Sequence, residues 1–177
     1  MGSLNGVLPG DVAALSCSAA ADGFDARRDA TSRAYCYRVL TRSARSVFWA
    51  GRALHWRQAL DVPAVERCAA AVVGEHDFTA FTPTETDHVR FERVVYAAYW
   101  QRAGEVLEFW IEADAFMRHM NRVLVGTMLE VGSGRRSVAD FVALLGGAPR
   151  ERAGPTALAC GLYLVGVGYG ERVLVGR

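Results

Sequence analysis

The sequence contains no lysine, so arginine supplies every fixed side-chain positive charge among its 177 residues. It also lacks any apolar run near the roughly 18 residues that a membrane-spanning helix needs. Residues 1–12 have neither a basic start nor a continuous apolar centre, and so do not match a secretory signal peptide. We therefore expect a cytoplasmic protein with no membrane partner.

Paired metal-ligand motifs are absent too. The four cysteines contain no C-x-x-C pair, and the four histidines are equally scattered. This spacing supports neither a zinc site nor a disulfide framework. We expect no bound metal.

What the chain does have is ample apolar material and an uneven charge. Hydrophobic residues make up 51% and charged residues 22%, which fits one folded domain, or one domain with an appended arm. Residues 24–57 carry eight arginines against Asp25 and Asp29, a net charge of +6, whereas the whole chain carries +1. Such an asymmetry indicates either a basic face for a polyanion or a solvated arginine-rich surface.

The hydrophobic periodicity predicts an α+β fold, with a mixed, largely antiparallel sheet and helices packed on one of its faces. Asp61 and Pro63 are typical of a helix start, and Ser137 with Asp140 forms a capping-box pattern. The other expected elements are a strand after a turn at residues 9–11, a strand from residue 34, a loop at 74–88, a hairpin of strands 89–101 and 106–113, a helix at 116–131, and a last strand at 161–169.

Three carboxylates of the expected hairpin, Glu108, Glu112 and Asp114, allow a hydrolase reading. Glu108 and Glu112 alternate with apolar residues along a strand, which is simpler to explain as the outer face of a sheet.

Residues 24–38 concentrate charge and aromatic rings. They include four arginines (Arg27, Arg28, Arg33 and Arg38) and two tyrosines, Tyr35 and Tyr37. Arginine forks fit phosphate oxygens, and aromatic faces stack on bases. The segment is therefore a candidate RNA-binding edge.

Five segments resemble the TruA-type tRNA pseudouridine synthases, and specifically their C-terminal half. Residues 24–38 carry F-x-A-R followed by R-x-Y-x-Y, and residues 116–132 are similar to the helix pattern F-x-x-H-M-x-R-x-x-x-G. Residues 157–167 are similar to the strand pattern A-x-x-x-G-L-x-L, and residues 74–81 to G-x-H-D-F-x-x-F. The opening LNGVLPGDV is similar to the stretch before the second half of these enzymes.

The resemblance implies a role for each motif residue. Tyr35 would pack against the flipped target base, Arg122 would pair with the catalytic aspartate, and Leu162 would line the base pocket. Phe116 and His119 would serve packing and orientation. Asp77 and Phe78 would shape a loop near the cleft, and the four arginines above would bind RNA.

The chain departs from the family pattern in one respect that bears on catalysis. The family's aspartate lies in a G-R-T-D-x-G-V-H motif, and no Arg-Thr-Asp triplet occurs here. Asn121 also stands where the helix pattern usually has an apolar residue. We therefore expect residues 1–23 to be a connector from a missing N-terminal half and residues 24–177 to be the C-terminal domain.

The resemblance also implies partners and an activity. The intact enzyme would isomerise uridine to pseudouridine in the tRNA anticodon stem-loop, as a homodimer and without a cofactor. The alternative is a non-catalytic RNA-binding module that kept the fold and lost the chemistry. A chain without its other half is expected to expose an apolar patch.

Overall fold

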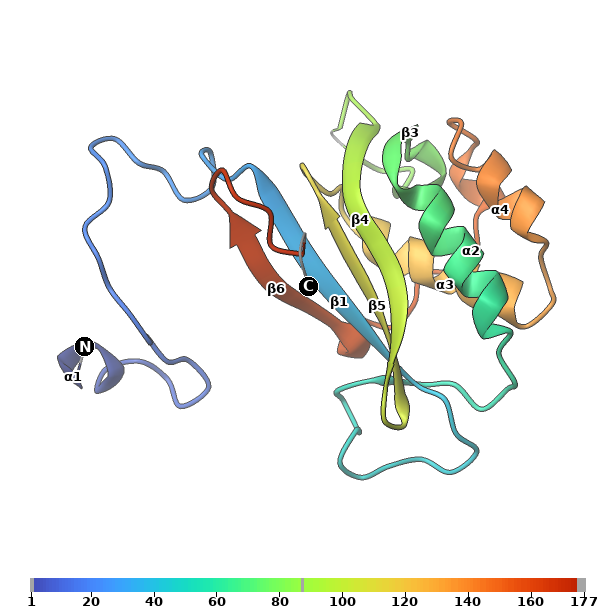
Figure 1. Cartoon of the computed structure of the whole chain (residues 1–177), viewed down its shortest axis with the longest axis horizontal. Coiled ribbons are helices and arrows are strands. Elements are labelled where there is room, and N and C mark those ends of the chain that lie inside the picture. The colour runs from blue at the N-terminus through green and yellow to red at the C-terminus, as the bar shows by residue number, and fades with distance from the viewer. Residues whose placement is uncertain (1, 87, 175–177) are drawn as a thin grey trace.

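The computed structural model describes residues 2–86 and 88–174 (Figure 1). Within them, six strands form one sheet in the order β2-β1-β5-β4-β3, with β6 also paired to β1. Only the β1–β2 pair is parallel, which confirms the α+β prediction of a largely antiparallel sheet. The strands are β1 (Ser32–Leu40), β2 (Leu54–His55), β3 (Gly74–Asp77), β4 (Glu92–Ala103), β5 (Val106–Ala113) and β6 (Leu162–Gly168).

Three helices cover one face of the sheet, as predicted, and the residues before β1 extend away from it (Figure 1). No helix in the described part of the chain is long and apolar enough to cross a membrane. The helices are α1 (Gly2–Asn5), α2 (Val62–Val72), α3 (Met120–Gly132) and α4 (Val138–Ala143), with 3-10 turns at Thr79–Phe81, Arg150–Arg152 and Ala159–Gly161.

Local sequence signals fix where α2 and α4 begin. The Asp61 carboxylate accepts a hydrogen bond from the Ala64 amide at 3.0 Å, which satisfies one of the free N–H groups of the first turn. Ser137 and Asp140 form the reciprocal capping box that the sequence predicts for α4. Both predicted helix starts are confirmed.

The β4–β5 hairpin is also confirmed, with Gly104 at a φ of 60° in its turn. Leu107, Phe109 and Ile111 of β5 face the helices and belong to the main core. The alternate side chains of β5 face the opposite side of the sheet, because successive strand residues point in opposite directions.

Three predicted elements are wrong. Helix α3 begins at Met120 rather than at residue 116, because His119 adopts the left-handed conformation with a φ of 62°. Residues 12–19 form no strand. Residues 74–77, expected in a loop, are strand β3, which pairs with β4.

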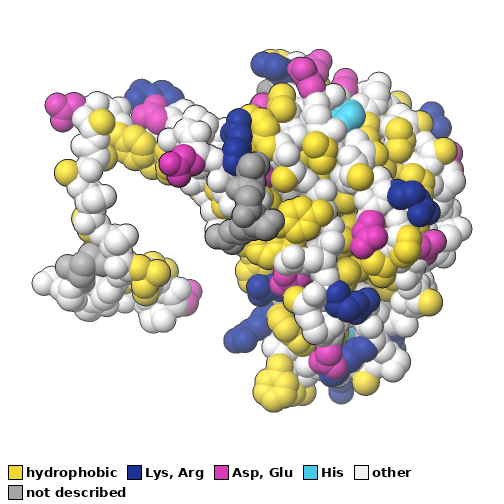
Figure 2. Space-filling view, viewed as in Figure 1, with side chains coloured by type: hydrophobic (Ala, Val, Ile, Leu, Met, Phe, Trp, Pro, Cys, Tyr) yellow, Lys and Arg dark blue, Asp and Glu magenta, His cyan; other side chains and the backbone are white. Residues whose placement is uncertain are grey.

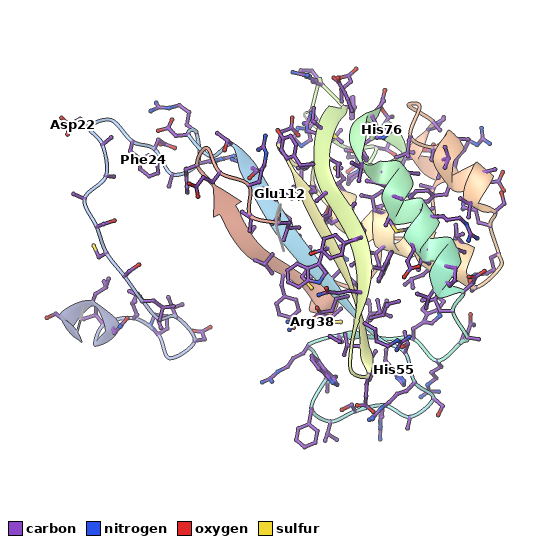
Figure 3. All side chains as sticks on the ribbon, in the orientation of Figure 1. Asp22, Phe24, Arg38, His55, His76 and Glu112 are labelled. Carbon is purple, nitrogen blue, oxygen red and sulfur yellow. The ribbon has the colours of Figure 1, made fainter. Side chains whose placement is uncertain are left out.

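The outer face of the sheet is less open than the alternation predicts. Glu112 is 0% exposed, and its carboxylate accepts hydrogen bonds from Ser32 Oγ (2.6 Å) and from the amides of Val173 (2.8 Å) and Leu174 (2.7 Å). Figure 3 shows Glu112 where the C-terminal segment crosses the sheet. This carboxylate therefore anchors the segment that follows β6.

Two motif glycines permit close backbone approach behind the sheet. A Cβ on Gly126 of α3 would lie 1.8 Å from the carbonyl oxygen of Pro155, and one on Gly161 would lie 2.7 Å from that of Arg38. Both distances are too short for any side chain. The segment between α4 and β6 can therefore lie directly against α3 and β1 only because both positions are glycine.

Candidate nucleotide-binding pocket

An open pocket of about 280 Å³ lies between the start of β1, the start of β6 and the segment before α3. A cavity of roughly 150 Å³ is enough to hold benzene, so this one has room for a single base. Four of its residues, Tyr35, Phe116, His119 and Leu162, are ones that the sequence motifs single out; Met117, Arg118, Met120 and Asn121 complete the lining.

Strand pairing places Tyr35 and Leu162 in this pocket although they lie far apart in the sequence. β1 and β6 are antiparallel, with Tyr37 opposite Leu162 and Tyr35 opposite Leu164. The register shifts between Ala34 and Tyr35, where β6 has one additional residue. Such bulges commonly re-aim a side chain beside a functional site.

The Tyr35 ring is held from the side by Phe116. Their ring centroids are 5.0 Å apart and the rings are nearly perpendicular, at 80°. This edge-to-face arrangement is a preferred aromatic contact. It leaves one aromatic side chain half-buried at the pocket wall, where a flat ligand can pack against it.

His119 lies at the turn from the pocket wall into α3, in a left-handed conformation that is uncommon for a residue other than glycine. Burial, together with the nearby positive charges of Arg122 and Arg118, lowers the pKa of its imidazole. A lowered pKa favours the neutral form of the ring. Its place at the turn fits the expected role in orientation.

Arg122 lies one residue beyond the pocket lining, in the first turn of α3. Its Nε donates to the carbonyl oxygen of Ala157 at 2.6 Å, and the Ala157 amide donates to the Arg122 carbonyl at 3.0 Å. Within residues 2–86 and 88–174, no carboxylate forms an ion pair with it. The Nε hydrogen bond thus orients the guanidinium, and its two terminal nitrogens remain available as hydrogen-bond donors.

Asp77 and Phe78 lie elsewhere, at the β3 edge of the sheet. The Asp77 carboxylate accepts from the Thr79 amide and hydroxyl, which closes a local turn, and the Phe78 ring is fully buried in the core. Thr82 links Phe78 to a pocket residue, because its hydroxyl donates to the Phe78 carbonyl and lies 3.1 Å from the sulfur of Met117. Neither residue lines the pocket described above.

The four candidate RNA-binding arginines fall into two groups. Arg27 and Arg28 are exposed. The Arg33 guanidinium donates to the carbonyls of Ala30, Asp114 and Arg27. On the face shown in Figure 2, arginines are spread among hydrophobic and acidic side chains rather than gathered in one patch.

Arg38 is committed to a contact on the outer face of the sheet. Its Nε lies 3.0 Å from Glu108 Oε1, and its Cζ lies 4.5 Å from the Tyr163 ring centroid and 5.8 Å from that of Trp49. Figure 3 shows Arg38 on the lower part of the sheet, above the loop that follows β1. Its charge is therefore largely used within the fold.

The hydrolase reading finds no support in the described residues. Glu108 is paired with Arg38, Glu112 holds the C-terminal segment, and Asp114 accepts from the amides of Val94 and Ala115. None of the three lines the pocket. In the described part of the chain, no group of three or more His, Cys, Asp and Glu side chains is arranged to hold a metal ion.

Motif reasoning assigned no site role to four residues that line the pocket: Met117, Arg118, Met120 and Asn121. Met117 and Arg118 lie inside the expected helix, where a helical pattern places them on different faces. Asn121 did carry a signal, because a polar residue interrupts an apolar position of the motif.

Comparison with known proteins shows the family to which the chain belongs. A family model described as tRNA pseudouridine synthase matches residues 68–170, more than half of the chain. The tRNA pseudouridine synthase A of Chromobacterium violaceum is 40% identical over 166 residues, which cover 94% of this chain and 63% of that protein. Those of Xanthomonas euvesicatoria and Caulobacter vibrioides are 41% and 39% identical, over 90% of this chain and 62% and 65% of theirs.

The mixed α+β fold is consistent with these matches, and the chain belongs to the tRNA pseudouridine synthase family. It spans a little under two thirds of the length of these curated relatives.

Proposed function

We propose that this chain is the C-terminal, RNA-gripping half of a tRNA pseudouridine synthase, which isomerises uridine in the tRNA anticodon stem-loop. Residues 1–23 would be the connector and residues 24–177, of which 175–177 lie outside the described residues, the domain itself. The observation that carries the proposal is the pocket, in which Tyr35, Phe116 and Leu162 meet beside Arg122.

The chemistry sets what the pocket has to do. The N1–C1′ bond of uridine breaks, the uracil turns, and C5 bonds to C1′, while the C5 proton leaves to solvent and N1 gains a proton. An aspartate starts this sequence as nucleophile or base. The detached base is recaptured in place, so the reaction needs no cofactor. The chain's own contribution would be to hold the flipped base between Tyr35 and Leu162 while it turns.

Arg122 would position the aspartate supplied by the other half. Nε is held by Ala157, and the two terminal nitrogens would form a fork that suits a carboxylate. A cation there keeps a carboxylate ionised. A half-buried arginine without a carboxylate partner in the described residues favours this role over the alternative of a non-catalytic RNA-binding module, in which no carboxylate would offset its burial.

The RNA backbone would be gripped mainly by exposed arginines such as Arg27 and Arg28, through phosphates and shape rather than base sequence. The intact enzyme would be a cytoplasmic homodimer. The expected apolar patch has a counterpart at β6, which within the described residues pairs with β1 alone and leaves Leu164 56% exposed. An open edge of this kind is suited to a further strand or chain.

Tritium release from tRNA labelled at C5 of uridine tests the proposal. The chain alone is expected to release none, and addition of a G-R-T-D-bearing first half of a TruA-type enzyme is expected to restore release. Arg122→Lys should then lower the rate by about 100-fold, the scale typical of a lost positioning contact. Arg90→Lys, an exposed arginine beside Glu92, is the matched control.

Each result has a definite meaning. No release from the combined halves contradicts the proposed enzyme activity. Release from the chain alone contradicts the assignment of the aspartate to another segment. An unchanged rate for Arg122→Lys contradicts the positioning role alone.

A further inference from the structure

Asn121 places an unsatisfied amide in the wall of the pocket. The residue is 5% exposed, it lines the cavity, and its buried Oδ1 has no hydrogen-bond partner. Its side chain makes no hydrogen bond with any residue of 2–86 or 88–174. Buried polar groups without a partner are rare in native proteins, so each needs an explanation.

The rest of the helix does not explain it. Thr127, the other buried polar side chain of α3, is satisfied, because its hydroxyl donates to the Val123 carbonyl at 2.7 Å and accepts from the Gly154 amide at 3.0 Å. Two other buried side-chain atoms of the described residues lack partners, Trp56 Nε1 and Arg93 Nε, but neither residue lines this pocket. Asn121 alone combines an unmet hydrogen bond with a ligand-sized space.

The place of Asn121 in the sequence motif is a second reason to look for a ligand. The residue belongs to the motif whose other members, Phe116 and His119, line the same pocket, and it stands where an apolar side chain fits the helix pattern. An apolar residue there would leave no group unpaired. An unpaired amide oxygen at this point is costly to the free protein, and a donor bound in the pocket would compensate it.

We propose that Asn121 hydrogen-bonds the target base and selects for an unsubstituted uracil imide. Uracil presents an N3–H donor beside a carbonyl acceptor, and a carboxamide presents the complementary pair, an oxygen acceptor beside an N–H donor. Two such bonds would fix the base edge while its face packs against Tyr35. This inference rests on the proposed function, since it takes the pocket to hold uridine.

The test compares two RNAs on two proteins. An anticodon stem-loop RNA and the same RNA with N3-methylated loop uridines are titrated with the full chain and with Asn121→Val. The methyl group removes the N3–H donor from which the Asn121 amide oxygen would accept a hydrogen bond. The native chain is expected to bind the unmethylated RNA about tenfold more tightly, the effect of one good hydrogen bond, and the variant should show a ratio near one.

The melting temperature distinguishes base recognition by Asn121 from a purely structural role. Asn121→Val removes an unpaired amide, so it should leave the melting temperature unchanged or raise it while abolishing the discrimination. Thr127→Val on the same helix is the matched control, because it breaks two internal hydrogen bonds away from the pocket. It should lower the melting temperature and keep the tenfold ratio.

Three outcomes contradict the inference in distinguishable ways. If both proteins bind the RNAs with the same ratio, Asn121 does not read the base, and the proposed function stands. If Asn121→Val is destabilised and keeps the ratio, the amide serves the fold. If neither RNA binds, the proposed function fails and the inference fails with it.

Discussion

Replacing Glu112 tests whether a buried carboxylate holds the C-terminal segment on the sheet. Glu112→Ala removes the acceptor for Ser32 Oγ and for the amides of Val173 and Leu174. Glu112→Gln keeps the shape but presents an NH₂ group to at least one of these donors. Both changes should release the segment, whereas the sheet behind it should remain.

The magnitude follows from those three contacts. A hydrogen bond to a charged group is worth about 1.5–3 kcal/mol, so three would suggest a large loss. The two backbone amides regain water once the segment leaves, however, and the buried carboxylate no longer has to be desolvated. We therefore expect Glu112→Ala to lower the free energy of unfolding by about 2–4 kcal/mol. In a domain of this size that is a fall of roughly 5–15 °C in melting temperature.

Urea denaturation and amide hydrogen exchange check this together. The denaturation midpoint gives the lost free energy, and exchange at Val173 and Leu174 should become fast while exchange in β5 stays slow. Glu105→Gln is the control, because Glu105 is exposed on the same hairpin and pairs only with Arg42 at the surface. Such pairs contribute about 0–1 kcal/mol. A Glu112→Ala chain with protected Val173 and Leu174 amides would refute the reasoning.

The pH dependence of the same variant has a definite sign. Burial opposes ionisation of Glu112, but the hydrogen bonds from Ser32, Val173 and Leu174 outweigh it and lower the pKa below its ordinary value of 4.5. A lowered pKa contributes stability that is fully present above 4.5 and is lost as the pH falls below it. The stability gap between the native chain and Glu112→Gln should therefore narrow as the pH falls from about 6 to about 3.

Three further changes separate packing, RNA binding and association. Gly126→Ala puts a methyl group onto the segment that crosses α3 and should lower the free energy of unfolding by about 3 kcal/mol or more. Gly10→Ala, with open space around it, should change this free energy little. Equal denaturation midpoints for the two variants would contradict the close-approach argument. Arg27→Gln should weaken RNA binding and reduce its salt dependence by about one charge while leaving stability unchanged. Arg33→Gln should instead lower the free energy of unfolding by about 1–2 kcal/mol. The opposite pattern would mean that the roles of the two arginines are reversed. Leu164→Arg should abolish concentration-dependent self-association in sedimentation, and a native chain that is monomeric throughout would count against the open edge.

Much of the fold could be predicted from the sequence because its signals are local. Asp61 and Ser137 mark helix starts through hydrogen bonds to residues three positions on, and the β5 alternation repeats every second residue. Strand β3 escaped prediction because a glycine followed by three polar residues carries no periodicity of its own, and pairing with β4 supplies its order. The start of α3 was misplaced because the left-handed turn at His119 interrupts an otherwise helical pattern.

The pocket residues, too, divide into those that local sequence motifs predict and those whose contacts depend on distant parts of the chain. Tyr35, Phe116, His119 and Leu162 were found through their motifs, and the fold brings them together. The commitment of Arg33 and Arg38 to internal contacts was not predictable, because their partners Asp114 and Glu108 lie about 70 to 81 positions away along the chain. The burial of Glu112 depends in the same way on residues about 61 and 62 positions further on.

The pairing of β1 with β6 ties the first strand of the sheet to the last. The Thr31 hydroxyl and the Gly168 carbonyl meet across 137 residues, a distance that a ribosome covers in roughly 7–27 s at ordinary rates of synthesis. During that interval the nascent chain has Tyr35 without Leu162, and residues 32–37 of β1 lack the partner strand β6. The hairpin and its helices can fold on emergence, but the pocket that Tyr35 and Leu162 share forms only after residues 162–168 have been synthesised. A ribosome-stalled chain that lacks β6 should accordingly be folded in its helical layer and unable to hold a nucleotide.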